Sequence, residues 1–244
     1  RGFIGHTTFL PQETQISMTI EQNCRKVEST VEAACLTAGR KREEVTVVAV
    51  TKTKPVEQVE ELYRLGYRHF AENRPEGLIE KQTALPQEDI YWHYIGTLQT
   101  RKVKQVINRI AYFHALDRMS LAKEINERAE KPVSCFVQVN VTGESSKHGL
   151  SASEAIPFIK SLEGFPNITV VGLMTMAPID ATDVELRRCF KDLKIIQEQV
   201  AALNLAHAPC TETSMGMSQD YPIAIAEGAT FVRVGSAFFA ETEA

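Results

Sequence analysis

The sequence predicts an α/β fold, a single-domain (β/α)8 TIM barrel with an extra N-terminal helix. Short β-branched segments alternate with amphipathic segments of helical periodicity along the 244-residue chain, and this alternation is typical of parallel strands joined by crossover helices. Eight such units at this length close naturally into a barrel. No Pro/Gly/Ser-rich linker marks a second domain. An open doubly wound sheet is the alternative, but no G-x-G-x-x-G motif follows a strand, so dinucleotide binding lacks its fingerprint.

The N-terminal segment predicts a helix over residues 18–40, before the first strand. One helix face is formed by the apolar residues Ile20, Cys24, Val27, Val31 and Ala34. Gly39 is a suitable C-cap. We expect the native start at Met18, residues 1–17 to be an appended or disordered extension, and the barrel to occupy residues 18–244.

The first strand is predicted at residues 45–50, where six apolar or β-branched residues follow one another. The run ends at Lys52, and Pro55 is a natural first residue of the next helix. A lysine at the carboxyl end of a buried strand can act as a Schiff-base nucleophile, because partial burial lowers its pKa. A surface lysine that simply closes a strand is the alternative.

The same unit repeats to the end of the chain. Further strands are predicted at residues 69–73, 91–96, 113–116, 135–140, 169–174, 209–213 and 230–234. Helices are predicted at residues 56–65, 102–110, 120–130, 153–162, 183–203, 218–227 and 236–240. Pro157 should limit its helix, because a backbone donor is lost inside it.

Functional side chains in a TIM barrel gather at the carboxyl ends of its strands. Read in order, the predicted strand ends are Lys52, Asn73, Gly96, Asn140, Met174, Ser214 and Arg233. The two asparagines could also simply tie loop backbone together. Segments 213–218 and 233–236 combine glycines with serines beside helix starts, which is typical of the phosphate site after strands 7 and 8; turn glycines with capping serines are the alternative. A lysine and a phosphate site at one mouth indicate pyridoxal 5′-phosphate (PLP).

Six motifs strengthen this interpretation. They are AVTKTKP (49–55), HFAEN (69–73), WHYIGTLQTRK (92–102), GLMTM (172–176), SMGMSQDY (214–221) and VRVGSAFF (232–239). In their order and spread the chain resembles the pyridoxal phosphate homeostasis protein family, PLP-binding barrels related to the N-terminal domain of alanine racemase. The resemblance implies that Lys52 holds PLP as an internal aldimine and that Asn73 lies near the ring. It also implies that Ser214, Gly235 and Ser236 bind the phosphate and that Arg233 faces the pyridine nitrogen.

Two lysines and one loop qualify this assignment. Lys54 is a rival for the Schiff base, although its position next to Pro55 points it toward solvent. Lys147 could lie over the mouth or be a solvated charge. The family's usual F-G-E-N is F-A-E-N here, followed by Arg-Pro-Glu where an aromatic residue is common, so the loop after Asn73 is expected to differ in shape.

The expected function is intracellular PLP (vitamin B6) homeostasis and amino/keto acid balance without established turnover. An arginine leaves the pyridine nitrogen unprotonated, so PLP stabilises carbanions less well than beside a carboxylate. Racemases of this barrel type use a tyrosine from an additional C-terminal domain, which we do not expect after Ala244. The alternative is a small PLP enzyme, such as a minor amino-acid racemase, with His93, His148 or Tyr221 as second acid/base. The histidine spacing does not favour a metal-dependent hydrolase.

Composition sets the expected partners and location. With a net charge of −4, neither nucleic acid nor a membrane is an expected partner. Five scattered cysteines without a C-x-x-C motif indicate a reducing compartment, and no apolar run is long enough to span a bilayer. We expect a cytoplasmic monomer that binds PLP, with PLP-accepting apoenzymes as possible protein partners.

Overall fold

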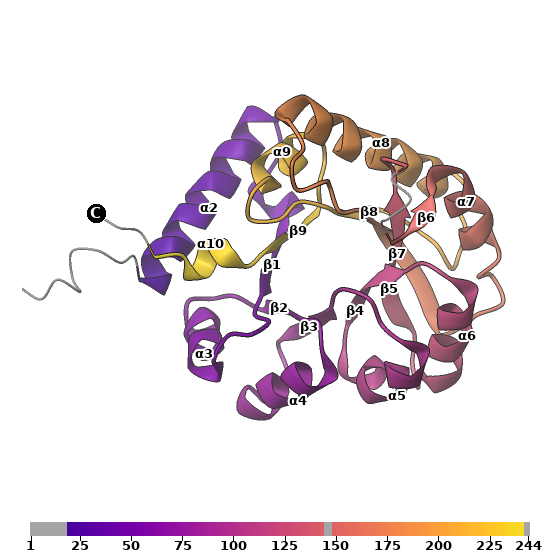
Figure 1. The fold of residues 1–244 in the computed structure, drawn as a ribbon, viewed down its shortest axis with the longest axis horizontal. Helices are drawn as coiled ribbons and strands as arrows, with labels where there is room; N and C mark the ends of the chain where they lie inside the picture. Colours follow the sequence, from indigo (N-terminus) through magenta and orange to yellow (C-terminus); the bar gives the residue numbers. More distant parts are fainter. Residues whose placement is uncertain (1–18, 144–147, 242–244) are drawn as a thin grey trace, which may run out of the picture.

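The computed structural model describes residues 19–143 and 148–241 and is a closed (β/α)8 barrel (Figure 1). The described strands are β1 (Thr46–Val50), β2 (His69–Glu72), β3 (Tyr91–Tyr94), β4 (Tyr112–Leu116), β5 (Val133–Asn140), β6 (Leu150–Ser151), β7 (Ile168–Met174), β8 (Glu212–Ser214) and β9 (Phe231–Val234). They follow the order β4-β3-β2-β1-β9-β8-β7-β5-β6, and pairing of β4 with β5 closes the sheet. All these pairings are parallel, and the two-residue β6 pairs only with the end of β5. The predicted TIM barrel is confirmed.

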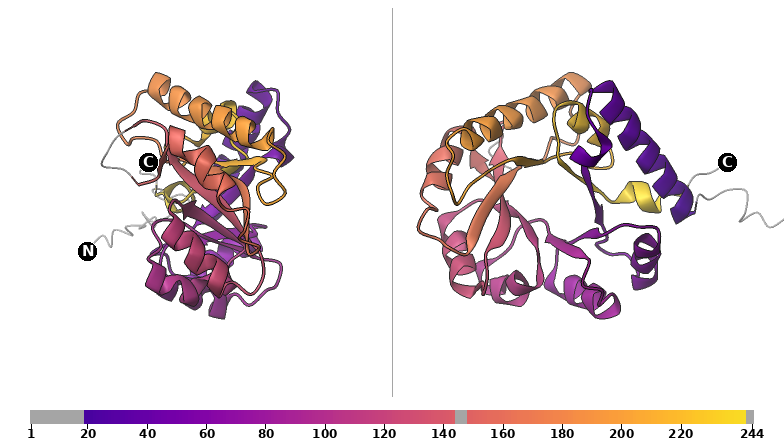
Figure 2. Two further views of the ribbon diagram at one scale, coloured as in Figure 1. Left: turned by 90° about the vertical axis from the view of Figure 1, so that its right-hand side faces the viewer. Right: turned by 180° about the vertical axis from the view of Figure 1, so that it is seen from behind.

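Helices surround the barrel on its outer side, as the two further ribbon views show (Figure 2). The α-helices in the described residues are α2 (Ile20–Thr37), α3 (Val56–Arg64), α4 (Pro75–Ala84), α5 (Val103–Val106), α6 (Met119–Arg128), α7 (Ala152–Lys160), α8 (Asp183–Ala201), α9 (Tyr221–Ala226) and α10 (Ser236–Phe239). Short 3-10 helices are η1 (Arg42–Glu44), η2 (Thr100–Lys102) and η3 (Ile107–Arg109). Each helix buries its apolar face against the outward side chains of the strands, which forms the main core.

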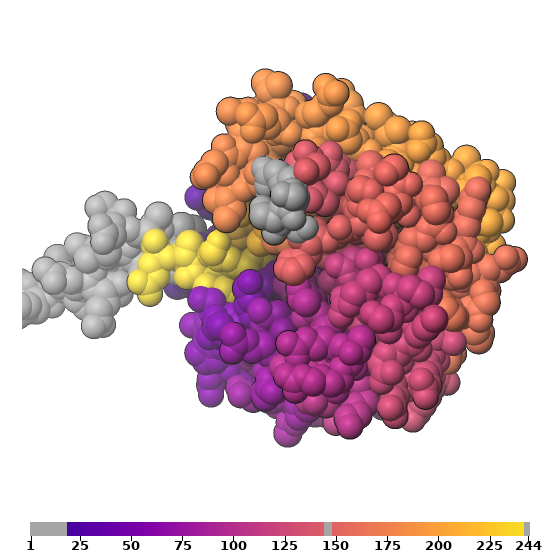
Figure 3. All heavy atoms as spheres, turned by 45° about the vertical axis from the view of Figure 1, so that its right-hand side comes forward, coloured from indigo at the N-terminus to yellow at the C-terminus, as the bar shows by residue number. Residues whose placement is uncertain are grey.

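The predicted extra helix α2 covers the seam between the first and last strands. It begins with a capping box, in which Gln22 N donates to Thr19 Oγ1 at 3.1 Å and Thr19 N donates to Gln22 Oε1 at 2.9 Å. Buried Asn23 donates through Nδ2 to the carbonyls of Phe238 and Ala240 at 2.9 and 2.8 Å. These bonds fasten α2 to the C-terminal segment, which lies against the N-terminal part of the chain in the space-filling view (yellow beside purple in Figure 3).

Three elements differ from the prediction. Helix α4 was not predicted, although it begins at Pro75, a favoured first helical residue. Helix α7 continues through Pro157 to Lys160 instead of being limited there; the hydrogen bond from Ser161 N to the Pro157 carbonyl, 3.1 Å, still closes its last turn. Segment 102–110 contains only one short α-helix between 3-10 turns. Local periodicity therefore predicted the positions of the strands more accurately than the lengths of the helices.

The inside of the barrel is filled by aromatic and histidine rings. The ring of Phe231 lies 5.4 Å from that of Tyr112 and 5.2 Å from that of Phe136. His93 stacks on Tyr112 at 4.5 Å, and His114 stacks on Phe136 at 4.4 Å. These rings close the barrel between its two ends, so a cavity at one end does not open into the other.

Candidate cofactor-binding site

A cavity of about 250 Å³ lies at the carboxyl ends of the strands. It is lined by Val50, Lys52, Asn73, Ile95, Gly96, Met174, Met176, Met217, Ser218, Gln219, Arg233, Gly235 and Ser236. Five of the six site residues predicted from the sequence therefore line one cavity, and Ser214 does not. No acidic residue is among the described residues of this lining, so its two cationic side chains favour an anionic ligand.

Lys52 reaches the cavity through a tight turn after β1. The strand ends at Val50, and Thr53 adopts the left-handed conformation with φ 64°. Lys54 N donates to the Thr51 carbonyl at 3.1 Å, which closes the turn. The rival Lys54 does not line the cavity; its Nζ lies 5.0 Å from the ring centre of Phe239. Of the two lysines, only Lys52 lines the cavity.

The buried pair of Glu72 and Lys81 holds Thr51 at the start of this turn. Thr51 Oγ1 donates to Glu72 Oε2 at 2.5 Å. Lys81 Nζ, on α4, lies 3.4 Å from both carboxylate oxygens of Glu72 and 3.3 Å from the Thr51 carbonyl. The Lys81 and Glu72 side chains are only 3% and 2% exposed. A Cβ on Gly77 would collide with the Glu72 carboxylate, so the glycine leaves space for the pair. The sequence did not predict the Glu72–Lys81 pair, because helix α4, which carries Lys81, was not predicted.

Arg233 extends from β9 beneath the cavity and is 4% exposed. Its Nη1 donates to Ser214 Oγ at 2.5 Å and its Nη2 to the Thr175 carbonyl at 3.1 Å. Burial lowers the pKa of the guanidinium to about 10, while the charge of Asp220 opposes this shift. The group therefore remains a cation at neutral pH where it lines the cavity.

Ser214 lies behind Arg233 and is completely buried. Its hydroxyl contacts Arg233 and His114, and Ser214 does not share the cavity with Gly235 and Ser236. Its position therefore does not support the predicted contact with phosphate. Strand β8 ends at Ser214, whose hydroxyl is held by His114 and Arg233, so a serine that faces the cavity must come from further along the chain.

Ser218 is that serine. The sequence placed it at the end of the 213–218 segment, but Ser214, not Ser218, was selected as the phosphate ligand. Helix α9 begins at Tyr221, not at Ser218 as predicted, which leaves Ser218 in the cavity lining. Its Oγ accepts hydrogen bonds from Gly235 N at 3.1 Å and Ala237 N at 3.2 Å. Two backbone donors thus converge on an oxygen at this point, as they do in anion sites. The S-x-x-x-S spacing of 214–218 contained the signal, but not which serine faces outward.

Asn73 follows β2 and is held by its backbone. Tyr94 Oη donates to the Asn73 carbonyl at 3.0 Å. Gly96, with φ 80°, passes close by, because a Cβ there would lie 3.8 Å from Asn73 Cβ. The side chain of Asn73 is thereby placed at the cavity wall beside Gly96.

The three acid/base candidates of the enzyme alternative lie elsewhere. His93 is buried inside the barrel, Tyr221 is buried under α2, and His148 lines a neighbouring groove with Met176. None of them belongs to the described lining of the cavity. Lys147 lies outside the described residues. Within residues 19–143 and 148–241 there is no group of three or more His, Cys, Asp or Glu that could hold a metal ion.

Comparison with known proteins identifies the family. The model of the alanine racemase N-terminal domain matches residues 19–243. A pyridoxal phosphate homeostasis protein from Aquifex aeolicus is 35% identical over 219 residues, which cover 88% of this chain and 95% of that protein. The chain belongs to the pyridoxal phosphate homeostasis protein family. The resemblance seen in the six motifs is confirmed.

Solved structures agree with this assignment. A crystal structure from Bifidobacterium adolescentis superposes with a TM-score of 0.86 at 31% identity, over 90% of this chain and 94% of the other. PipY from Synechococcus elongatus, solved with PLP bound, gives a TM-score of 0.80 at 28% identity, over 91% of this chain and all of PipY. Alanine racemase from Corynebacterium glutamicum, at 14% identity and a TM-score of 0.64, shares the fold alone. None of the described helices has the length and apolar character that a bilayer span requires.

Proposed function

We propose that this chain binds PLP in the cavity at the carboxyl ends of the strands and takes part in PLP homeostasis. The observation that supports this most directly is that one cavity contains an amine, a cationic donor and a converging set of anion donors. These belong to Lys52, Arg233 and the Ser218–Gly235–Ser236 group. PLP has an aldehyde, a pyridine nitrogen and a phosphate, so each part of the cofactor has a chemically suited partner.

Lys52 is the residue that we assign to the covalent linkage, an internal aldimine. It is exposed at the cavity mouth, and the buried Thr51–Glu72–Lys81 network holds the residue before it. Ser218, Gly235 and Ser236 are assigned to the phosphate: the Gly235 N–H donates to Ser218 Oγ, and the hydroxyls of Ser218 and Ser236 are the assigned phosphate donors. Ser214 serves instead to hold Arg233, and Asn73 lies at the cavity wall near the ring.

Arg233 bears on whether the site turns over a substrate. When bound, PLP supplies an electron sink, whose strength depends on protonation of the pyridine nitrogen. Arg233 stays cationic and has no lone pair to accept a proton from that nitrogen. Storage or delivery of PLP to apoenzymes is therefore the function that we favour, in line with the name of the Aquifex aeolicus relative.

Spectroscopy of the purified protein with added PLP tests this proposal. We expect the visible absorption band of a lysine aldimine, which borohydride should fix covalently to Lys52. Lys52→Ala should lose the band, whereas the matched control Lys54→Ala should keep it. A band that persists in Lys52→Ala would disprove the assignment. Ser218→Ala should weaken PLP binding more than Ser214→Ala does in the same assay.

Incubation of the loaded protein with L-amino acids in deuterated water separates the two functional classes. A homeostasis protein should show negligible exchange of the α-hydrogen. Sustained exchange would instead favour the small PLP enzyme.

A further inference from the structure

A continuous chain of hydrogen bonds runs through the inside of the barrel and ends at Arg233. His69 Nδ1 lies 2.9 Å from His93 Nε2, and His93 Nδ1 lies 2.8 Å from His114 Nε2. His114 Nδ1 lies 2.8 Å from Ser214 Oγ, which accepts from Arg233 Nη1 at 2.5 Å. The five residues come from β2, β3, β4, β8 and β9, so only closure of the barrel brings them together.

The histidines of this chain are neutral at pH 7. His93 and His114 are fully buried among aromatic rings, and desolvation lowers the pKa of both well below the usual value for histidine. Burial also lowers the pKa of His69, to about 4. Tyr91 and Tyr112 are the titratable side chains stacked against these rings. Each neutral imidazole has one N–H donor and one acceptor nitrogen, so the chain must have a direction.

Arg233 determines that direction, because a guanidinium can only donate. Ser214 Oγ accepts from Arg233, and the nitrogen of His114 is the acceptor within reach of its own hydroxyl proton. In the opposite direction the buried serine would accept twice and its proton would have no partner in the chain, which is costly. His114 therefore carries its proton on Nε2 and donates to His93, which in turn donates from Nε2 to His69.

This direction of the hydrogen-bond chain also stabilises the buried positive charge of Arg233. Every acceptor atom of the chain then points toward the arginine, and aligned hydrogen bonds polarise one another. Among the described residues, the carboxylate of Asp220 is the one whose charge raises the pKa of Arg233. The chain thus supplies directed dipoles at the inner side of a cation that makes no ion pair among the described residues.

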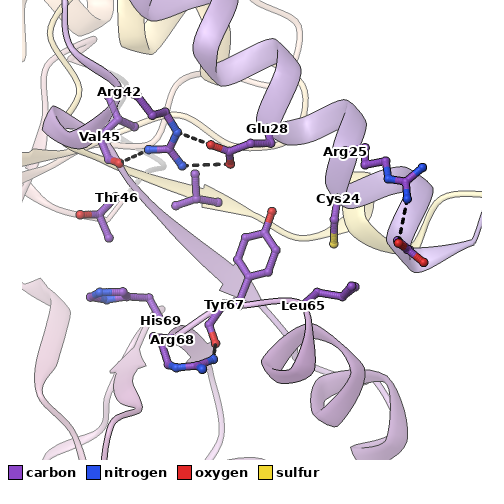
Figure 4. A pocket seen from close by; sticks show the side chains of 13 residues that line it. Cys24, Arg25, Glu28, Arg42, Val45, Thr46, Leu65, Tyr67, Arg68 and His69 are labelled. Carbon is purple, nitrogen blue, oxygen red and sulfur yellow. Dashed lines mark hydrogen bonds and ion pairs between the residues drawn. The ribbon is translucent and has the colours of Figure 1, made fainter.

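The other end of the chain opens at the opposite face of the barrel. His69 lines a cavity of about 530 Å³ between α2 and the starts of β1 and β2 (Figure 4). The arginines around it are already paired, since Arg42 binds Glu28 and Arg68 binds Asp89. In the direction set by Arg233, the last proton of the hydrogen-bond chain is on Nε2 of His69, the residue that borders this cavity.

We propose that His69, His93, His114 and Ser214 are positioning residues that form one oriented hydrogen-bond chain and hold the guanidinium of Arg233 from inside the barrel. The proposal rests on the proposed function, because Arg233 matters to PLP only if it faces the pyridine nitrogen. Changes at His69, on the far side of the barrel, are then transmitted to His114 and Ser214 through the linked tautomers.

Nitrogen-15 NMR of the protein without cofactor tests the chain independently of PLP. At pH 7 we expect His69, His93 and His114 to be neutral and protonated on Nε2. His207 is a built-in reference, because its Nε2 must donate to the Ile159 carbonyl 2.8 Å away. His69→Phe should shift the nitrogen signals of His114, which it does not contact through a hydrogen bond. An Nδ1-protonated His114, or unchanged His114 signals in His69→Phe, would refute the chain.

A pH titration of the absorbance of bound PLP tests the positioning of Arg233. Ser214→Ala should move the midpoint by about one pH unit, a tenfold change in proton affinity. Ser214→Thr keeps the hydroxyl and should restore the midpoint, and His207→Gln should not move it. Equal midpoints in the wild type and Ser214→Ala would overturn the positioning role. Absence of PLP binding in the wild type would defeat the proposed function. The NMR spectra would still show whether the oriented hydrogen-bond chain exists.

Discussion

The buried Lys81–Glu72 pair provides the most sensitive test of how the fold supports Lys52. Replacing Lys81 by Met keeps most of the side-chain volume but removes the charge. Nζ lies 3.4 Å from the carboxylate, and at an effective dielectric constant of about 20 this corresponds to an attraction of about 5 kcal/mol. Desolvation of both groups offsets much of that attraction, so the intact pair contributes little net stability.

The variant Lys81→Met differs from the intact pair, because it leaves Glu72 buried without its cation. Removing one partner of a buried pair costs about 3–5 kcal/mol, and we expect Lys81→Met to lose that much free energy of unfolding. Thr51, which both groups contact, should become less well ordered. PLP should consequently dissociate faster from the neighbouring Lys52.

Urea unfolding followed by fluorescence measures the loss directly, since Trp92 is the single tryptophan and is buried. Lys123→Met, an exposed lysine within α6, is the matched control and should change stability little. The double variant Glu72→Gln/Lys81→Met should recover most of the loss, because no unpaired charge remains. A loss below about 1 kcal/mol in Lys81→Met would refute this account of the pair.

Three further predictions concern the strand packing, the interior histidines and the cysteines. Gly172→Ala places a Cβ against the backbone carbonyl of Glu212, so it should lower the free energy of unfolding by about 1–3 kcal/mol in urea titrations; unchanged stability would show that the strands can separate freely. The histidines of the interior chain have lowered pKa values when folded, so the unfolded state binds more protons below pH 6.5. Stability should be complete above that pH and fall as the pH drops from about 6.5 toward 4, by up to about 1.4 kcal/mol per pH unit for each histidine; a flat profile over this window would contradict their burial. All five cysteines are buried, and burial raises the pKa of Cys135 and Cys210 to about 12. Thiol reagents should therefore label the protein only after unfolding, and rapid labelling of the folded protein would argue against this packing.

The position of Arg233 at the cavity has an electrostatic consequence for the site. A cation at this position needs support from the protein interior, since no carboxylate pairs with it in the described residues. The neutral histidine chain offers such support without adding a negative charge. A carboxylate in place of Ser214 would neutralise Arg233 and change the electrostatic environment of the ring.

The local sequence determined the strand pattern and most of the cavity. β-Branched runs located the barrel strands. The rule that function gathers at their carboxyl ends selected Lys52, Asn73 and Arg233, and the glycine/serine pattern of segment 233–236 added Gly235 and Ser236; all five line the cavity. These inferences succeed because strand periodicity and strand ends are properties of a few neighbouring residues.

The tertiary structure alone decided which side chains meet across the barrel. The choice between Ser214 and Ser218 depends on where β8 turns and how α9 begins. The contact of Lys81 with Glu72 depends on how a helix packs against its strand. The histidine chain depends on the relative registers of five strands, up to 164 residues apart from His69 to Arg233. Register and closure are set by the packing of the whole sheet, so no short segment of the sequence contains them.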